Sequence, residues 1–424
     1  MNRLIARLAT LWFLVRRSLR QHAVSTAITA ACVSLACGLS IAVFSVKAQT
    51  QAAFTGGNAG FDAVLGARGS ALQLVLNAVY HLETSPGNIP WQLYQDVKRD
   101  PRVTLAIPYA VGDSYRGFRV VGTTAEVFTT LEYRAGEKLT VAHGGRCFDP
   151  ARREAVIGST VAARSGLRVG ACFAPSHGIA RDAEQHDEQY VVVGVLEPSN
   201  SPCDRVIFIP IDGVFRMSGH VLRGSGDAYT PRAGLAIDDA HKEVSAVLLK
   251  LNGTQAGFAL DQAINRQGKV ATLAWPIGTV MAELFDKLGW VNRVLELVAY
   301  LVVIVAAASI LASLYNTMNE RRREVAILRS LGARRRTVFG VIVLEASTIA
   351  AAGSMLGILV HFSIMAVVAA VLQRETGVVL HVLTFQPVMV IAPGAMVTLG
   401  ALAGLVPAAK AYGTEVALHL APTS

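Results

Sequence analysis

Histidine and carboxylate side chains gather in one stretch of the sequence, and their chemistry can be judged from residue type alone. The stretch contains two histidines and four acidic residues, His177, Asp182, Glu184, His186, Asp187 and Glu188. Imidazole nitrogens and carboxylate oxygens are ligands that Zn²⁺ takes from proteins. The ligands that we expect for a metal ion on this loop are His177, His186, Asp187 and Glu188. A solvated polar loop that binds nothing is the alternative, and the sequence leaves both open.

A second group of residues is suited to docking. Seven arginines stand among the nineteen residues 319–337, between long apolar stretches at 298–315 and 338–372. A basic loop between two membrane spans faces the cytoplasm. The run therefore fixes the topology, and it offers a contact surface to a soluble partner. A basic loop that only sets topology is the alternative.

The same run has the pattern of a short helix. Apolar side chains at Val325, Ile327, Leu328 and Leu331 form one face, while the arginines project into headgroups and water. Gly332 is placed to end this helix, because glycine is the common residue just past a helix C-terminus.

Motifs of the common catalytic classes are absent from the sequence. There is no G-x-S-x-G, H-E-x-x-H or C-x-x-C. There is also no P-loop, since Gly268-Lys269-Val270 lacks both the upstream glycine and the hydroxyl residue that cradle phosphate and Mg²⁺. We therefore expect that the chain is not an enzyme and binds no cofactor itself.

Two ionisable residues fall inside the third apolar stretch, where such residues are functional candidates by default. Glu345 lies near its cytoplasmic end and is expected to pair with an arginine of the run, whereas His361 lies deeper. Among the five cysteines, Cys147 and Cys172 flank one strand–helix–strand stretch and could form a disulfide. The odd third outside thiol, Cys203, leaves that pairing open.

Composition indicates a membrane protein. Of the 424 residues, 52% are apolar and only 16% are charged, against about a quarter charged in soluble proteins. The net charge of +9 could indicate a nucleic-acid partner, but the arginines sit beside apolar spans at 3–20 and 321–336. The positive-inside rule accounts for them, and we expect no nucleic-acid binding.

Four stretches reach the roughly 20 apolar residues that a transmembrane helix needs. The expected order is an interfacial helix (1–22), span one (23–46), an outside domain (47–290), span two (291–315), the basic segment (316–337), span three (338–372), a short outside loop (373–385), span four (386–411) and a tail (412–424). Both termini then lie in the cytoplasm. A cleaved signal peptide is the alternative for the first span, but that span is long for one.

The outside domain reads as mixed α and β. Strand-like runs rich in β-branched residues occur at 103–107, 118–122, 190–196, 205–210 and 245–250. Helical patterns occur at 90–99, 159–165 and 254–266. Unbroken helical spacing at 48–54 and 281–296 predicts a stalk. The expected fold is thus four membrane helices with a large α/β domain inserted after the first.

The basic segment also carries a family resemblance. Residues 320–333, followed by Val343-Leu344-Glu345-Ala346 and the closing stretch 405–411, resemble the signature of FtsX/MacB-type ABC transporter permeases, the type VII class. Residues 136–139, 154–158 and 166–170 are similar, more loosely, to the MacB-like periplasmic core domain.

The resemblance implies a function. The basic segment would be a coupling helix, with Glu320, Arg321, Arg322, Arg323, Glu324, Val325, Ile327, Leu328, Arg329, Leu331 and Gly332 contacting an ABC ATPase subunit. That partner would bind ATP and Mg²⁺, and a homodimer of the permease would work by mechanotransmission in the lipid of a bacterial inner membrane. Substrate export, or extraction from the periplasm or membrane, is then expected.

Other functions stay open at this point. An FtsX-like complex could instead activate a periplasmic cell-wall hydrolase, and the histidine-rich loop could serve metal-linked transport. The substrate is not apparent, nor is the need for a periplasmic adaptor or lipoprotein.

Overall fold

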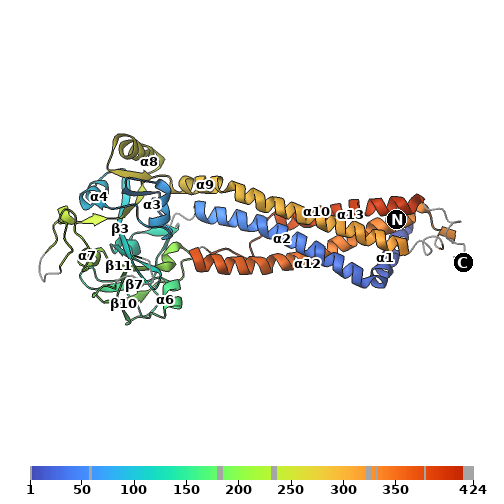
Figure 1. Ribbon diagram of the computed structural model, residues 1–424, viewed down its shortest axis with the longest axis horizontal. Helices are drawn as coiled ribbons and strands as arrows, with labels where there is room; N and C mark the ends of the chain where they lie inside the picture. The colour runs from blue at the N-terminus through green and yellow to red at the C-terminus, as the bar shows by residue number, and fades with distance from the viewer. Residues whose placement is uncertain are drawn as a thin grey trace. The chain divides into compact units, whose positions relative to one another are not determined.

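The structure, a computed structural model, describes residues 2–56, 60–134, 136–178, 185–230, 236–320, 327, 329–330, 332–376 and 379–413. It divides into two compact units, whose elements are drawn in Figure 1. The membrane unit comprises residues 1–49, 289–370 and 381–424, and the second unit, which holds the outside domain, comprises residues 50–288 and 371–380.

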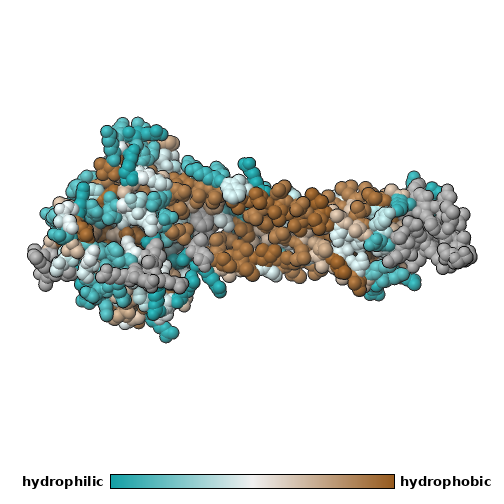
Figure 2. All heavy atoms as spheres, in the orientation of Figure 1, coloured by the Kyte–Doolittle hydropathy of each residue, from teal (hydrophilic) through white to brown (hydrophobic). Residues whose placement is uncertain are grey.

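The membrane unit contains helices joined by short non-helical segments and no strand among its described residues. Its helices are α1 (Asn2–Gln21), α2 (Ala23–Gly56), α10 (Gly289–Glu320), α12 (Arg335–Thr376) and α13 (Val388–Gly413). All but α1 are long and apolar enough to cross a membrane, and apolar atoms cover these helices in Figure 2. The predicted fold class, four membrane helices with a large α/β domain inserted in the chain between the first and the second, is confirmed.

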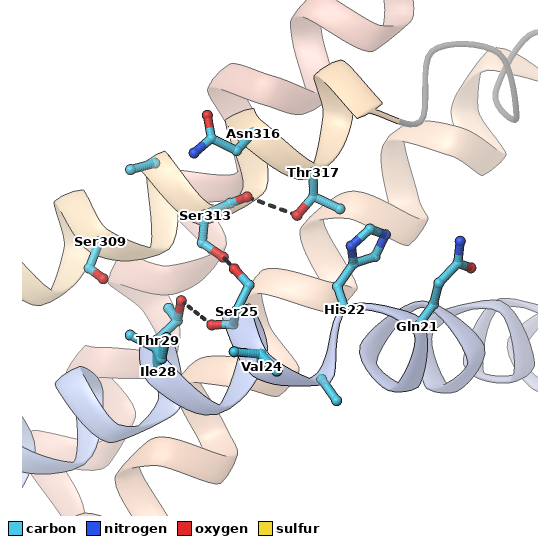
Figure 3. A pocket seen from close by; sticks show the side chains of 12 residues that line it. Gln21, His22, Val24, Ser25, Ile28, Thr29, Ser309, Ser313, Asn316 and Thr317 are labelled. Atoms are coloured by element: carbon cyan, nitrogen blue, oxygen red, sulfur yellow. Dashed lines mark hydrogen bonds between the residues drawn. The ribbon is translucent and has the colours of Figure 1, made fainter.

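Polar contacts join α2 and α10 at two levels. Ser25 and Ser313 lie 2.9 Å apart through their Oγ atoms (Figure 3). Lys47 donates to Glu296 at 2.5 Å. The two helices therefore run antiparallel. A rise of about 1.5 Å per residue separates the contacts by roughly 33 Å along α2, which matches the roughly 30 Å of a bilayer's hydrocarbon core.

The end of this pair that holds Ser25 is polar and open. A groove of about 690 Å³ lies between the start of α2 and the end of α10, and Asn316 and Thr317 are among its lining residues (Figure 3). Thr29 donates to the Ser25 carbonyl at 2.8 Å, and Thr317 to the Ser313 carbonyl at 2.9 Å. This lining suits a level where water or headgroups reach the helices.

Small residues bring α2 and α12 into backbone contact. A Cβ placed on Gly353 would lie 2.7 Å from Val33 Cβ, and one on Gly357 would lie 2.9 Å from the Ser34 carbonyl oxygen. The two contacts advance together along both helices, so α2 and α12 run parallel. Gly353 and Gly357 therefore form a Gly-xxx-Gly packing face.

The outside domain is built on a sheet of ten strands. Its order is β14 (Ala271–Ala274), β1 (Ala63–Ala67), β13 (Ala246–Leu251), β3 (Val103–Tyr115), β4 (Phe118–Thr123), β11 (Val206–Pro210), β7 (Glu154–Ile157), β10 (Tyr190–Val195) and β8 (Cys172–Phe173), with β9 (Ser176–His177) on β3. The pairs β10–β7 and β11–β4 are parallel, and the rest are antiparallel. Two short pairs stand apart, β12 (Glu243–Val244) with β2 (Ile89–Pro90) and β5 (Glu132–Arg134) with β6 (Glu137–Lys138).

Short helices surround this sheet (Figure 1). They are α3 (Ala71–Ala78), α4 (Trp91–Lys98), α5 (Glu126–Thr129), α6 (Ser159–Ser165), α7 (Ile211–Phe215), α8 (Thr254–Asp261) and α9 (Ile277–Lys287). A 3₁₀ turn at Pro202–Arg205, another at Asp239–His241 and a π-helical turn at Gln262–Gln267 complete the elements. Alternating strand residues such as Leu65, Val120, Ile207 and Val247 form the buried core.

The predicted unbroken helix at 281–296 is wrong at one point. Helix α9 ends at Lys287 and α10 begins at Gly289. Leu288 between them has φ −83° and ψ 0°, which lies outside the α region and ends the hydrogen-bonded ladder. Before the domain in the sequence, α2 does continue through 48–54, to Gly56.

His81 is held in an unusual state within the outside domain. Its φ is +57°, and its ring stacks on Tyr109 with centroids 6.2 Å apart. Burial of the ring, aided by the positive charges of Arg119 and Arg205, lowers the pKa of His81 to about 3. The folded domain therefore requires a neutral imidazole at this position.

Replacing Gly357 by leucine should destabilise the membrane unit. The new side chain would overlap Ser34 and Cys37 on α2, and overpacking costs about 1–3 kcal/mol. Thermal unfolding of the detergent-purified chain measures this. Gly394→Leu on α13 is the matched control, because a Cβ there meets no atom within 4 Å. Equal losses in both variants would contradict close packing of α2 on α12.

Acid should destabilise the outside domain through His81. Because its folded pKa of about 3 lies below the unfolded value of 6.5, its contribution is complete above pH 6.5 and falls by about 1.4 kcal/mol per pH unit toward the folded pKa. His81→Asn keeps a residue tolerant of positive φ but removes the titration. Hydrogen exchange of the β3 and β4 amides is measured in the variant and the parent chain at each pH. As the pH falls, the variant should lose less exchange protection than the parent chain. An equal loss of exchange protection in acid in the His81→Asn variant and the parent chain would contradict the role assigned to His81.

Candidate functional site

Four side chains from separate parts of the outside domain converge on one point. Asp113 lies on β3, His177 on β9, His186 before β10, and His220 in the segment after α7. One potential ligand atom from each lies within 4.8 Å of every other. This set, Asp113 with the three histidines, is called the His3Asp cluster below.

A β-bulge aims Asp113 at the cluster. The pairing of β3 with β4 shifts register between Val111 and Asp113, which leaves Gly112 as the extra residue, and bulges of this kind redirect the next side chain. Asp113 then pairs with His177 across β3 and β9. The Gly178 amide donates to the Gly112 carbonyl at 2.9 Å, so backbone bonds fix the first half of the cluster.

Distances within the cluster are short and similar. Oδ1 of Asp113 lies 3.4 Å from His177 Nδ1 and 3.2 Å from His186 Nε2. Its Oδ2 lies 3.3 Å from His220 Nε2. The three imidazole centroids are 5.1, 5.2 and 5.5 Å apart, and every ring pair is close to edge-on.

Neighbouring groups fix the orientation of His186. Its Nδ1 lies 2.9 Å from the Ser218 carbonyl oxygen, which can only accept, so Nδ1 carries the proton. Ser218 is held in turn by Glu188, whose carboxylate accepts from its amide at 3.0 Å and from its hydroxyl at 2.9 Å. The Nε2 atom is thereby directed at Asp113, as outer hydrogen bonds commonly do for a ligating histidine.

His220 completes the cluster from a turn after α7. Its carbonyl accepts from the Tyr229 amide at 2.6 Å, which closes the turn. Its Nε2 atom is enclosed by protein and makes no hydrogen bond with any described residue, although it lies 3.3 Å from Asp113. His220 therefore contributes a buried ring nitrogen next to the Asp113 carboxylate.

Electrostatics keep the Asp113 carboxyl ionised. Burial alone would raise its pKa, but the contacts with His186 and His220 outweigh burial and lower the pKa of Asp113 to about 2. The hydrogen bond to Asp113 raises the pKa of His186. His177 is the accessible member, with its side chain 60% exposed, while Asp113 is 2% exposed. The cluster is therefore an anionic, nitrogen-rich site open on one side.

The sequence located half of this cluster. His177 and His186 were predicted as ligands and are members. Asp187 and Glu188, the other two predicted ligands, are not members: Asp187 is exposed, and the Glu188 carboxylate accepts a hydrogen bond from the Ser218 amide. Strand pairing, which brings Asp113 next to His177, assembles the cluster from separate segments of the chain. Asp182 and Glu184 lie outside the described residues.

Two members, Asp113 and His220, were missed. The available signal for Asp113 was a lone carboxylate beside a glycine in the apolar run Tyr109-Ala110-Val111-Gly112-Asp113. Such a pattern is typical of a bulge next to a functional residue. His220 sits in a polar stretch and offered no signal of its own.

The coupling segment falls largely outside the described part of the chain. This applies to Arg321, Arg322, Arg323, Glu324, Val325, Leu328 and Leu331, and to the side chain of Glu320. Ile327 is helical and 42% exposed. Gly332 has φ +98°, the left-handed conformation of a residue that ends a helix. The coupling role itself stays a prediction.

The two ionisable residues of the third span are both buried. Glu345 accepts a hydrogen bond from Ser18 of α1, so the amphipathic N-terminal helix is tied to α12. An arginine partner for Glu345 stays a prediction. His361 is fully buried, and its ring nitrogens have no hydrogen-bond partner among the residues that the structure describes.

The suggested disulfide between Cys147 and Cys172 is not formed in the structure. Both residues carry free thiols, with Cys147 half-buried and Cys172 exposed on β8. The third outside cysteine, Cys203, is buried and also free.

Comparison with known proteins covers both parts of the chain. Residues 26–265 match the MacB-like periplasmic core domain, and residues 296–416 match the FtsX-like permease C-terminal domain. The chain is 26% identical over 310 residues to the macrolide export ATP-binding/permease protein MacB of Azoarcus sp. (strain BH72). That alignment covers 70% of this chain but only 42% of the relative.

Solved structures give weaker likenesses. The extracellular domain of the noncanonic ABC-type transporter YknZ from Gram-positive bacteria is 15% identical, with 50% of this chain and 97% of that one covered and a TM-score of 0.27. The periplasmic region of MacB from Actinobacillus actinomycetemcomitans is 11% identical, with 54% and 94% covered and a TM-score of 0.33. TM-scores this low do not establish a shared fold.

The domain matches and the helices agree with each other. The periplasmic core match spans more than half of the chain, and the permease match spans the last three membrane helices. Four candidate membrane helices with a periplasmic-type domain fit a multi-pass inner-membrane protein. The chain belongs to the FtsX/MacB-type ABC transporter permeases, a family with a MacB-like periplasmic core domain.

Proposed function

We propose that this chain is the membrane subunit of an ABC transporter whose ATP is bound and hydrolysed by a separate subunit. The family implies an ABC ATPase partner and a dimer. The observation that carries the proposal is that the chain matches the FtsX-like permease C-terminal domain over residues 296–416 and the MacB-like periplasmic core domain over residues 26–265. In this proposal, ATP and Mg²⁺ belong to the partner, and this chain performs no bond chemistry.

The arginine-rich segment is the proposed docking element for that ATPase. It links the end of α10 at Glu320 directly to the start of α12 at Arg335. A displacement of the segment therefore acts on both helices at once. Helix α12 continues for 42 residues, about 63 Å at 1.5 Å per residue, so it is long enough to carry the displacement across the bilayer.

Two further contacts support transmission by connected helices. The Ser18–Glu345 hydrogen bond ties α1 to α12 near the docking element, and the Gly353–Gly357 face ties α12 to α2. Helix α2 runs without a break from Ala23 to Gly56, where the chain enters the outside domain. The proposed output of ATP hydrolysis is thus a conformational change of the outside domain, which is mechanotransmission.

Export or extraction from the periplasmic side is the proposed direction. Four spans in each subunit leave little room for a wide hydrophilic tunnel. A homodimer would supply eight spans and two docking elements for two ATPase subunits. The proposed orientation, with both termini in the cytoplasm, follows from the basic flanks of spans one to three.

Substitution in the docking element should uncouple the two subunits. Arg323→Ala and Leu328→Ala remove a charge and an apolar contact from the proposed ATPase-facing helix. We expect stimulation of the partner ATPase, measured in reconstituted bilayers, to fall by about tenfold, since loss of one good contact of about 1.4 kcal/mol has that effect.

Arg152→Ala is the control for that experiment. Arg152 is an arginine of the outside domain, 69% exposed, and its replacement should leave stimulation unchanged. Full stimulation in both docking variants, or failure of the chain to co-purify with its ATPase, would refute the proposal.

A further inference from the structure

We infer that the His3Asp cluster binds one divalent transition-metal ion, with Zn²⁺ as the ion that fits best. The site joins Asp113, His177, His186 and His220. The inference goes beyond the proposed transport function and does not depend on it. It replaces the expectation that this chain binds no cofactor.

The spacing of the ligand atoms is the first argument. Zn²⁺ bonds to nitrogen and oxygen are about 2.0–2.1 Å long, so ligand atoms at the corners of a tetrahedron lie about 3.3 Å apart. The observed separations from Asp113 to the three histidines are 3.2, 3.3 and 3.4 Å. Two of these distances run to Oδ1 and one to Oδ2 of Asp113, and one ligand atom from each of the four residues lies within 4.8 Å of every other.

The types of ligand are the second argument. Three imidazole nitrogens and one carboxylate oxygen suit Zn²⁺ and its first-row neighbours. Ca²⁺ takes six to eight oxygen ligands and Mg²⁺ a near-octahedral oxygen set, so neither matches. Soft Cu(I) selects sulfur, and no cysteine belongs to the cluster.

Preorganisation is the third argument. Nδ1 of His186 donates to the Ser218 carbonyl, so Nε2 is the nitrogen that faces Asp113 and is available to an ion. Nε2 of His220 is enclosed without a hydrogen bond, and Asp113 is a carboxylate that is 2% exposed. Burying polar groups costs free energy unless they bind a partner. One divalent cation would bind the two ring nitrogens and the carboxylate at the same time.

Accessibility is the fourth argument. Asp113, His186 and His220 are largely enclosed, with side chains 2%, 6% and 18% exposed, whereas His177 is 60% exposed. An ion therefore has an entry path on the His177 side. The site suits an ion that equilibrates with the compartment around the outside domain.

Binding would also order part of the domain. His220 belongs to the turn that Tyr229 closes, while Asp113 and His177 belong to β3 and β9. An ion would join that turn to the sheet through bonds that the backbone does not supply. Metal-dependent protection of residues 185–190 and 216–230 against hydrogen exchange is therefore expected.

Titration of the metal-free, detergent-purified full chain with Zn²⁺ tests the inference. We expect one tightly bound ion per chain in competition with a chromophoric chelator, and Co²⁺ in its place should show the visible bands of a tetrahedral centre. His220→Ala and His177→Ala should each weaken binding by more than about 100-fold, since losing even an outer-shell partner costs about 10–100-fold.

Glu188→Gln and His143→Ala complete the experiment. Glu188 holds Ser218 without touching the ion, so its variant should weaken binding by about 10–100-fold. His143 is exposed and outside the cluster, so its variant should bind as the parent does. The His177 side chain is exposed and lies on a strand of two residues, so its replacement removes little packing. His177→Ala therefore tests the site even if His220→Ala does not fold.

Two outcomes would overturn the inference. One is a parent chain that takes up no stoichiometric Zn²⁺ and gains no exchange protection, which would mark the cluster as a hydrogen-bonded His–Asp group. The other is full binding in the folded His177→Ala and His220→Ala variants, which would place the ion elsewhere.

Discussion

The thickness of the bilayer's hydrocarbon core is the constraint on which the membrane unit depends. The Ser25–Ser313 and Lys47–Glu296 contacts mark two levels of one antiparallel helix pair, and the helix rise puts them about 33 Å apart. Between these levels helix backbones satisfy their own hydrogen bonds, as hydrocarbon requires. The ring of His361, on α12, is fully buried.

Strand β3 has a comparable role in the outside domain. Its first half pairs with β13 and its second half with β4 and β9, so one strand of 13 residues joins the two halves of the sheet. The bulge at Gly112 lies within the half that pairs with β4. It is followed directly by Asp113, which pairs with His177 of β9, so the irregularity of the ladder and the first contact of the His3Asp cluster are adjacent on one strand.

The parts that sequence alone predicted are those governed by local pattern. Span lengths, the five predicted strands and helices α4 and α6 follow from contiguous apolar runs and periodicity, and the basic segment carried enough pattern to indicate the family. The His3Asp cluster could be predicted only in part. Asp113 and His177 are neighbours solely because β9 pairs with β3, and no spacing along the chain encodes that pairing. The helix break at Leu288 was missed for a related reason, since one residue of non-helical backbone leaves the apolar periodicity intact.

The Gly-xxx-Gly face between α12 and α2 has a mechanical consequence. These helices run parallel, and their backbones touch without intervening side chains that could yield. A load applied at Arg335 would therefore divide between two routes to the outside domain, one through α10 and the other through α12 into α2. The α10 route crosses the break at Leu288, whereas α2 is continuous to Gly56. The two helices are thus joined to the outside domain differently: α2 leads into it as one unbroken helix, whereas α10 is preceded by a non-helical residue.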